Sequence, residues 1–265
     1  MKNEILSNIT TECPWRDTLL WYDTVDSTNT RAKELAKAGA PAGTLLVADA
    51  QTQGRGRLGR SFSSPEGTGV YLSVILRPNC PPDALMHLTC VTAVAACRAV
   101  ERAAGFVPQI KWANDLVWQQ KKLGGILTEL GLGAKGNVDY AIIGIGINCN
   151  QLVPDFPPEL QAMATSIRQI TGLPCPPAKL AAALTEELYR LNRQLLADKA
   201  ELMDNYRTLC ITPGREISVI RGDEKYYAKA LSVDDEGGLV ILSPDGKIST
   251  VTSGEVSVRG MYGYL

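Results

Sequence analysis

One stretch constrains the fold more than any other: Tyr140-Ala141-Ile142-Ile143-Gly144-Ile145-Gly146-Ile147-Asn148. In a strand successive side chains point to opposite faces, which gives two sets here: Ile143, Ile145 and Ile147 on one face, Gly144, Gly146 and Asn148 on the other. Glycine inside a strand weakens it, so a face almost without side chains indicates that something approaches closely. A ligand or another backbone is favoured, and tight packing of a helix is the alternative.

Other short apolar runs predict the rest of a sheet. The predicted strands are 44–48, 70–76, 110–112, 116–118 and 123–130, and the spacings among the last three suit hairpins. Apolar residues at helical spacing predict helices that begin near Ser27, at 82–104, at 177–198 and onward to about Cys210. The sequence therefore predicts the α+β class, with a mixed, mainly antiparallel sheet packed by helices.

The pattern changes after Pro213-Gly214, where short strands alternate with glycine turns. The predicted strands are 216–220, 226–231, 238–242, 248–251 and 255–258. So many short strands in a small segment indicate a small β-barrel. We therefore expect a large domain over residues 1–211 and a small C-terminal domain over residues 212–265.

The run Gly54-Arg55-Gly56-Arg57-Leu58-Gly59-Arg60, here called the strap, is cationic and flexible. Its glycines free the backbone, and its arginines offer planar charged groups that suit phosphate or carboxylate oxygens. The whole chain has 27 Lys and Arg against 28 Asp and Glu, which argues against a general nucleic-acid or membrane-surface binder. Positive charge is thus concentrated in one segment, and the strap predicts a polyanionic ligand.

The sequence of the strap does not match either of two common phosphate-binding motifs. Gly54, Gly56 and Gly59 match the spacing of a dinucleotide fingerprint, but the following 61–67 segment does not begin a helix, and no Gly-Lys-Ser/Thr follows for a Walker loop. Two readings remain, an arginine–glycine RNA-binding tract or a loop that orders around a bound nucleotide. Predicted strands flank the strap on both sides, which favours the nucleotide loop.

Histidine and cysteine usage excludes several other chemistries. His87 is the single histidine and lies in a helical pattern as a half-buried packing residue, so Ser-His-Asp catalysis and histidine-rich zinc sites are not expected. The seven cysteines contain no C-x-x-C pair, Cys149 is expected to be a packing residue, and no signal peptide or membrane span is predicted. We expect reduced thiols in a soluble, cytoplasmic protein.

Two cations, a carboxylate and an amide also gather in the predicted hairpins, at Lys111, Lys122, Asp115 and Asn114. Leu123-Gly124-Gly125 follows Lys122, which would let a ligand lie over the strand beside the ammonium group. Asp115 could assist Mg²⁺ or orient an amine, and a structural carboxylate in a turn is the alternative.

Five segments, in order and at matching spacing, closely resemble the biotin protein ligase family. They are Ser27-Thr28-Asn29, Gln51 to Arg60, Lys111-Trp112-Ala113-Asn114-Asp115, Lys122 to Leu127 and Gly144 to Asn148, with Gly254-Glu255-Val256-Ser257 near the C-terminus. The resemblance implies a class II synthetase-like biotin/lipoate ligase catalytic domain followed by a small SH3-like β-barrel. It also implies an acid–amino acid ligase of EC class 6, which makes biotinyl-5′-AMP from biotin and MgATP and then biotinylates a lysine of a biotin carboxyl carrier protein.

The resemblance implies a role for each matching residue. Lys122 and Arg57 are expected to be catalytic. The expected biotin-binding residues are Ser27, Thr28, Asn29, Gln51, Arg55, Gly56, Arg57, Lys122, Gly125 and Gly144. The expected residues for the adenylate and ATP are Arg55, Arg57, Arg60, Lys111, Asn114, Lys122 and Asn148, with Phe62 as the aromatic residue at the exit of the strap. Asp115 is the candidate metal ligand.

Partners and rival functions follow from the same resemblance. The family includes members with an N-terminal DNA-binding domain, but only about twenty residues precede Asp23 here, so no DNA binding is expected. A homodimer through the sheet is a further expectation. The alternatives to a biotin ligase are a lipoate or octanoate transfer enzyme of the same fold, and a noncatalytic regulator that binds biotin or a nucleotide.

Overall fold

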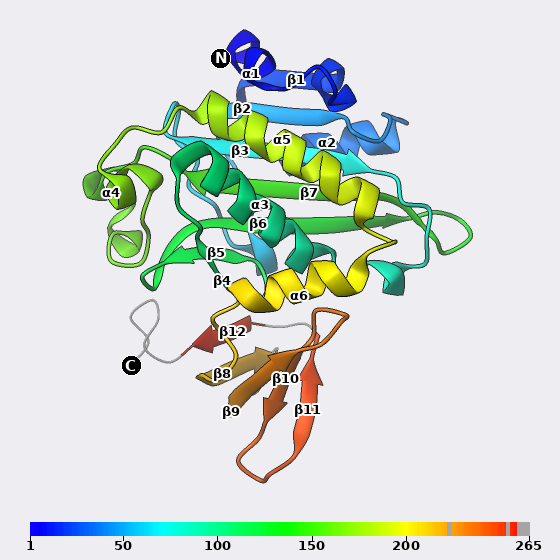
Figure 1. Ribbon diagram of the computed structural model, residues 1–265, viewed down its shortest axis with the longest axis vertical. Helices are drawn as coiled ribbons and strands as arrows, with labels where there is room; N and C mark the ends of the chain where they lie inside the picture. The colour runs from blue at the N-terminus through cyan, green and yellow to red at the C-terminus, as the bar shows by residue number, and fades with distance from the viewer. Residues whose placement is uncertain (222–223, 253–254, 259–265) are drawn as a thin grey trace.

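The computed structural model describes residues 1–221, 224–252 and 255–258, and its centre is a seven-stranded mixed sheet (Figure 1). The order of the strands is β1-β2-β3-β7-β6-β5-β4. Their bounds are Leu19–Val25 (β1), Leu45–Gln51 (β2), Gly69–Leu76 (β3), Gln109–Lys111 (β4), Asp115–Trp118 (β5), Lys121–Leu132 (β6) and Val138–Asn148 (β7). β1 and β2 are parallel, and the other neighbours are antiparallel. The predicted sheet and its hairpins are confirmed, whereas β1 was not predicted.

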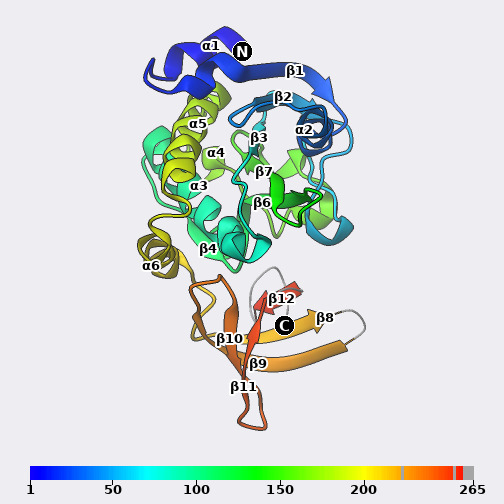
Figure 2. The same cartoon turned by 90° about the vertical axis from the view of Figure 1, so that its right-hand side faces the viewer.

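Helices cover both faces of this sheet, as Figure 2 shows. The α-helices are Lys2–Asn8 (α1), Thr28–Lys37 (α2), Leu88–Ala104 (α3), Ile167–Thr171 (α4), Pro177–Gln194 (α5) and Lys199–Leu209 (α6). Short 3₁₀ helices lie at Pro14–Thr18, Arg57–Gly59, Pro82–Leu85, Val153–Asp155 and Pro158–Leu160. α3 and α5 pack on one face and α2 on the other, which confirms the α+β class.

The two faces of β7 meet different helices. Ile143, Ile145 and Ile147 belong to the large apolar core that α3 and α5 share. Ala32 and Ala36 of α2 form a smaller core with Leu46, Ile75, Tyr140 and Ile142 on the opposite face. The glycine face of β7 is therefore the face that α2 covers only in part, and this is where the cavity lies.

α3 differs in two ways from its prediction. Prolines hold its first turn in a 3₁₀ form, so the α-helix begins at Leu88, and His87 is its N-cap residue. His87 is fully buried rather than half-buried, and its Nε2 lies 3.1 Å from the carbonyl oxygen of Leu195. By length and hydropathy alone Pro82–Ala104 could cross a membrane, but 72% of its most apolar window is buried within the protein, as in a core helix.

A second, five-stranded antiparallel sheet follows α6. Its strands are Glu216–Arg221 (β8), Glu224–Val233 (β9), Leu239–Leu242 (β10), Ile248–Val251 (β11) and Glu255–Val258 (β12), in the order β11-β10-β9-β8-β12. All five predicted C-terminal strands are present, and Gly254 lies outside the described residues. The indole Nε1 of Trp112 donates a hydrogen bond of 2.8 Å to the carbonyl of Gly237, which joins this sheet to the first one.

Candidate active site

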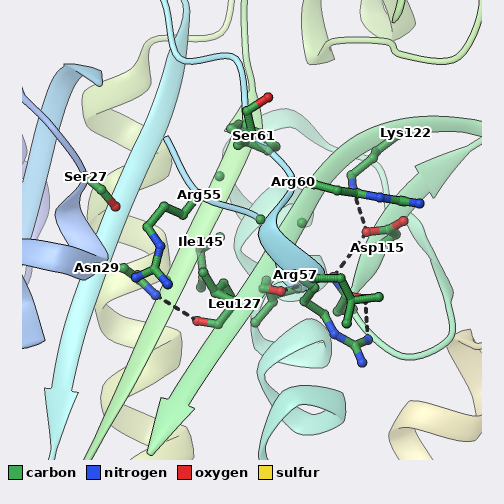
Figure 3. A pocket seen from close by; sticks show the side chains of 18 of the residues that line it. Ser27, Asn29, Arg55, Arg57, Arg60, Ser61, Asp115, Lys122, Leu127 and Ile145 are labelled. Carbon is green, nitrogen blue, oxygen red and sulfur yellow. Dashed lines mark hydrogen bonds and ion pairs between the residues drawn. The ribbon is translucent and has the colours of Figure 1, made fainter. Parts of the chain in front are cut away.

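A cavity of about 140 Å³ opens on the glycine face of the large sheet (Figure 3). The N-terminus of α2, the strap and strands β4 to β7 surround it, and Val256 of the C-terminal sheet completes its wall. The predicted site residues that line it are Ser27, Thr28, Asn29, Gln51, Arg55, Gly56, Arg57, Arg60, Phe62, Lys111, Asn114, Asp115, Lys122, Gly125 and Gly144. Segments far apart in the sequence thus meet around one space.

The N-terminus of α2 forms a neutral, polar end of this cavity. Ser27 is the N-cap residue of α2 and accepts a hydrogen bond from the backbone N–H of Thr30. The backbone N–H and the hydroxyl of Thr28 donate to Oε1 of Gln51 at 2.8 and 3.1 Å. Gln51 donates in turn from Nε2 to the hydroxyl of Ser64. This end of the cavity therefore offers fixed neutral donors and acceptors.

Asn29 fills the gap that Gly144 leaves in the sheet. Ser73 of β3 and Leu127 of β6 lie opposite Gly144 on either side of β7. The amide of Asn29 sits between them: Nδ2 donates to the carbonyl of Leu127 at 3.3 Å, and Oδ1 lies 2.7 Å from the hydroxyl of Ser73. A Cβ atom at Gly144 would lie 1.9 Å from Oδ1 of Asn29, so any other residue there would force the amide or the start of α2 to shift.

Gly146, the next glycine on this face, lies under an aromatic ring. A Cβ atom at Gly146 would come within 2.6 Å of Cε1 of Phe62, and the Phe62 ring packs edge-on against Tyr71. The helix-packing explanation of the bare face therefore applies at Gly144, which a residue of α2 approaches closely, and both glycines line the cavity.

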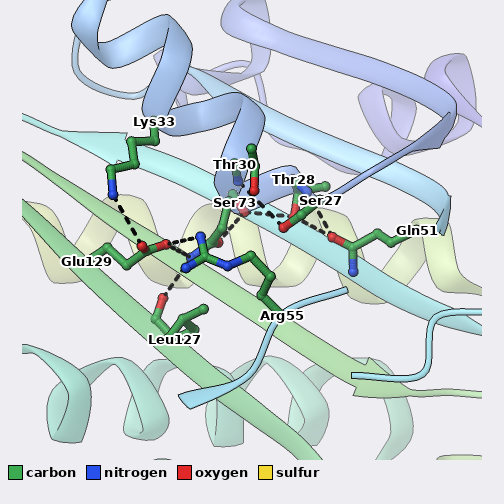
Figure 4. Close-up of polar contacts among 10 residues, drawn as sticks. Ser27, Thr28, Thr30, Lys33, Gln51, Arg55, Ser73, Leu127 and Glu129 are labelled. Carbon is green, nitrogen blue, oxygen red and sulfur yellow. Dashed lines mark hydrogen bonds and ion pairs between the residues drawn. The ribbon is translucent and has the colours of Figure 1, made fainter. Parts of the chain in front are cut away.

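Two residues of the polar network were missed from the sequence, Ser73 and Glu129 (Figure 4). Oε2 of Glu129 accepts hydrogen bonds of 3.1 Å from both Asn29 and Arg55. The alternation of β6 places Glu129 on the same face as Gly125 and Leu127, and this pattern could have identified it. Ser73 carries no comparable signal, because only its register opposite Gly144 brings it to the site.

The strap is an ordered turn rather than an open loop in this structure. Arg55 and Ser61 form an antiparallel bridge, and the N–H of Gly56 donates to the carbonyl of Arg60 at 2.7 Å. At the tip, Leu58 takes the left-handed conformation with a φ of 55° and is exposed. Arg57 donates from Nη1 to Oδ1 of Asn114 at 2.9 Å, so strap and hairpin touch across the cavity.

Cations surround one carboxylate at the other end of the cavity. Lys122 Nζ lies 2.7 Å from Oδ1 of Asp115, which also accepts a hydrogen bond from Nδ2 of Asn114. Burial would raise the pKa of Asp115, but Lys122, Lys111 and Arg57 outweigh burial and lower it. Asp115 is therefore ionised at neutral pH, and this end of the cavity keeps a net positive charge that suits an anionic ligand.

Of the predicted site residues, Asn148 lies outside the described lining of the cavity, whereas Asp115 lies within it. Asn148 is absent from the described lining of the cavity, because its Nδ2 donates to the carbonyl of Thr165 and its Oδ1 accepts from Gln151. Asp115 is the one carboxylate among the described lining residues, and no group of three metal-binding side chains occurs in the described part of the chain. A Mg²⁺ ion here would take most of its ligands from phosphate oxygens, as Mg²⁺ commonly does.

Comparisons with known proteins agree with this geometry. The sequence model of the biotin/lipoate A/B protein ligase family matches residues 21–148. The sequence model of the biotin protein ligase C-terminal domain matches residues 212–259. The bifunctional ligase/repressor BirA of Bacillus subtilis is 39% identical over 91% of this chain and 74% of its own length. This chain belongs to the biotin protein ligase family.

Other members of the biotin protein ligase family match over most of their length. A biotin–[acetyl-CoA-carboxylase] ligase of Mycobacterium tuberculosis is 30% identical over 86% of this chain and 85% of its own. The structure of a biotin protein ligase from Aquifex aeolicus in complex with biotin and ATP superposes with a TM-score of 0.77 at 33% identity. That comparison covers 91% of this chain and 98% of the Aquifex chain.

Proposed function

We propose that this chain activates biotin with ATP to form biotinyl-5′-AMP and pyrophosphate, and then transfers the biotinyl group to a lysine of a biotin carboxyl carrier protein. One observation carries the proposal: a neutral polar network and a cluster of cations line opposite ends of one cavity. Biotin has a neutral ureido ring at one end and a carboxylate at the other, and it would match both ends. Membership of the biotin protein ligase family supports the same reaction.

The first step brings two anions together. An oxygen of the biotin carboxylate attacks the α-phosphorus of ATP, and the bond to the β-phosphate oxygen breaks to release pyrophosphate. Lys122 and Arg57 are proposed as the catalytic residues, because fixed positive charge offsets the repulsion between the reactants and the charge that develops on the phosphoryl group. Lys111 adds a further cation at the same end of the cavity.

The remaining binding roles are proposals of the same kind. We assign biotin to Ser27, Thr28, Asn29, Gln51, Arg55, Gly56, Gly125 and Gly144, with Arg57 and Lys122 reaching its carboxylate. We assign the adenylate to Arg55, Arg57, Arg60, Lys111, Asn114 and Lys122. Asn148 stays outside this assignment because it is absent from the described lining of the cavity. Asp115 would hold a Mg²⁺ ion beside the phosphates, where the metal would neutralise charge.

The second step needs a carrier lysine to reach the adenylate. Its ε-amine attacks the carbonyl carbon of the mixed anhydride, and AMP leaves. Until then the strap would cover the adenylate and exclude water. The strap's contacts from Arg55 to Glu129 and from Arg57 to Asn114 would hold it over the cavity.

Further proposals concern the molecule as a whole. We propose a catalytic domain over residues 1–211, a C-terminal domain over residues 212–265, a soluble cytoplasmic protein and a homodimer formed through the sheet. In the sequence given, the residues before β1 form α1 and a 3₁₀ turn whose Ile5 and Trp15 pack into the core. We therefore propose that these residues bind no DNA. Light scattering tests the proposed homodimer, and a gel-shift titration with duplex DNA tests the proposed lack of DNA binding.

Exchange of radioactive pyrophosphate into ATP tests the proposed first step without a carrier protein. Exchange that depends on added biotin is the expected result, and its absence would refute the ligase assignment. Lipoate and octanoate in place of biotin test the alternative enzyme class, and binding without exchange would identify a noncatalytic regulator. Transfer of labelled biotin to a purified carrier domain then tests the second step.

A further inference from the structure

Glu129 lies behind the wall of the cavity, where it contacts two parts of the site at once. Its side chain is 16% exposed, and it is absent from the described lining residues, whereas Asn29 and Arg55 are present. It projects from β6 beneath the N-terminus of α2 (Figure 4). A carboxylate in such a place is costly to bury unless donors surround it.

Two hydrogen-bond donors and one further cation surround the Glu129 carboxylate. Nδ2 of Asn29 and Nη1 of Arg55 each lie 3.1 Å from Oε2, and Nζ of Lys33 lies 3.6 Å from Oε1. Asn29 and Lys33 belong to α2, and Arg55 belongs to the strap. Glu129 therefore connects the helix that bears the neutral end of the cavity to the segment that covers it.

Glu129 also decides which way the amide of Asn29 points. A carboxylate and the carbonyl of Leu127 can only accept hydrogen bonds, so both require the NH₂ end of Asn29. The carbonyl end must then face Ser73 and Gly144. Without the carboxylate, one acceptor of the NH₂ group is lost and the two orientations of the amide come closer in energy.

The orientation of the Asn29 amide affects the rest of the polar network through a chain of hydrogen bonds. The hydroxyl of Ser73 lies 2.7 Å from Oδ1 of Asn29 and 2.8 Å from Oγ1 of Thr28. Thr28 in turn donates to Gln51. A change at Glu129 is therefore transmitted through Asn29 and Ser73 to groups that line the cavity.

We infer that Glu129 is a positioning residue for biotin recognition, which fixes the Asn29 amide and restrains Arg55 without touching the ligand. The inference rests on the proposed function. Charge-assisted hydrogen bonds are among the strong ones, so the loss of both contacts should weaken biotin binding by about 10-fold or more. The chemical step involves Lys122 at the other end of the cavity and should change little.

The test compares Glu129→Ala and Glu129→Gln with the wild type by calorimetric titration with biotin and by the kinetics of pyrophosphate exchange. Glu129→Ala should raise the Kd and KM for biotin by about 10-fold, with kcat within about threefold of wild type. Glu129→Gln keeps an acceptor for Asn29 and should lie between wild type and Glu129→Ala. A thermal melt of Glu129→Gln close to that of wild type shows that the fold is intact.

Asp139→Asn is the matched control. Asp139 forms an ion pair of 3.2 Å with Arg77 on the same sheet, and neither residue is among the described lining residues. Loss of this ion pair in Asp139→Asn should leave the Kd for biotin within about twofold of wild type. If wild type binds biotin but Glu129→Ala has an unchanged Kd, or loses kcat alone, the inference is wrong. If wild type binds no biotin, the proposed function fails first.

Discussion

The ammonium of Lys122 lies 2.7 Å from the carboxylate of Asp115, across the β5–β6 hairpin. The register of the hairpin brings the two residues together, because Asp115 pairs with Gly125 and Lys122 lies three residues before that glycine on β6. A Cβ atom at Gly125 would lie 3.4 Å from Lys122 Nζ and 3.5 Å from Asp115 Oδ1. Asp115 therefore fixes the position of the proposed catalytic cation, and a Cβ atom at Gly125 would touch both partners of the ion pair.

Lys122→Ala should nearly abolish adenylate formation. Removal of one preorganised electrostatic contact costs about 100- to 1,000-fold in comparable sites, and biotin-dependent pyrophosphate exchange should fall by that factor. The neighbouring Lys121 is exposed and lies outside the described lining, so Lys121→Ala is the control and should keep wild-type exchange. Near-normal exchange in Lys122→Ala would remove this residue from its proposed role.

Arg57→Ala should shorten the time for which the adenylate is retained. The variant loses the bond between the strap and Asn114, together with one cation of the cavity. Dissociation of biotinyl-5′-AMP should become about 10-fold faster or more, and released adenylate should label lysines beyond the carrier site. Arg31→Ala removes an exposed arginine of α2 and should change neither rate. Unchanged dissociation together with labelling confined to the carrier would contradict the proposal.

Gly144→Ala should impair both biotin binding and stability. Its Cβ atom would overlap Oδ1 of Asn29, so the amide or the start of α2 must shift. Strain of this kind typically costs about 1–3 kcal/mol of unfolding free energy. Gly133→Ala is the control, since its Cβ atom would make an ordinary 3.6 Å contact with Asp139. Equal biotin affinity and equal thermal stability of the two variants would show that the close approach at Gly144 is unimportant.

His87 should make the stability of the protein depend on pH. Burial lowers its pKa from the ordinary value of 6.5, so the folded state takes up a proton less readily than the unfolded state. Stability is therefore complete above the unfolded-state pKa of 6.5 and decreases as the pH falls from there toward the lowered pKa of the folded state.

Chemical denaturation of wild type and His87→Gln between about pH 5 and pH 8 measures this contribution. The glutamine side chain of the variant cannot titrate, so the difference in unfolding free energy between the two proteins should depend on pH only below about 6.5. Parallel curves over the whole range would show that His87 does not titrate on unfolding.

Local patterns in the sequence predicted most of the fold. Glycines and apolar alternation marked β7, the hairpin spacings marked β4 to β6, and helical periodicity marked α3 and α5. β1 was not predicted, because it is an edge strand whose pairing with β2 is set by the tertiary structure. The 3₁₀ turn before α3 also departs from the predicted continuous helix, since Pro81 and Pro82 fix the backbone there.

The candidate site was predicted only where its residues occur in short motifs. Ser27, Arg57 and Lys122 were found in this way, and all three line the cavity. Ser73 and Val256 were not, because each reaches the site through contacts between elements distant in the sequence. Asn148 also belongs to a predicted motif and shares a strand face with Gly144, but its amide bonds to Thr165 and it is absent from the described lining of the cavity.

The alignment of three strands at Gly144 has a consequence for how this site can evolve. Ser73 and Leu127 flank that glycine because β3, β7 and β6 keep a single register. A point substitution changes one contact, but deletion of one residue within β3 would turn all the residues beyond it to the opposite face. Changes in chain length should therefore be tolerated in the connecting loops and eliminated within these strands, so the sheet wall of the cavity can diverge only through substitution.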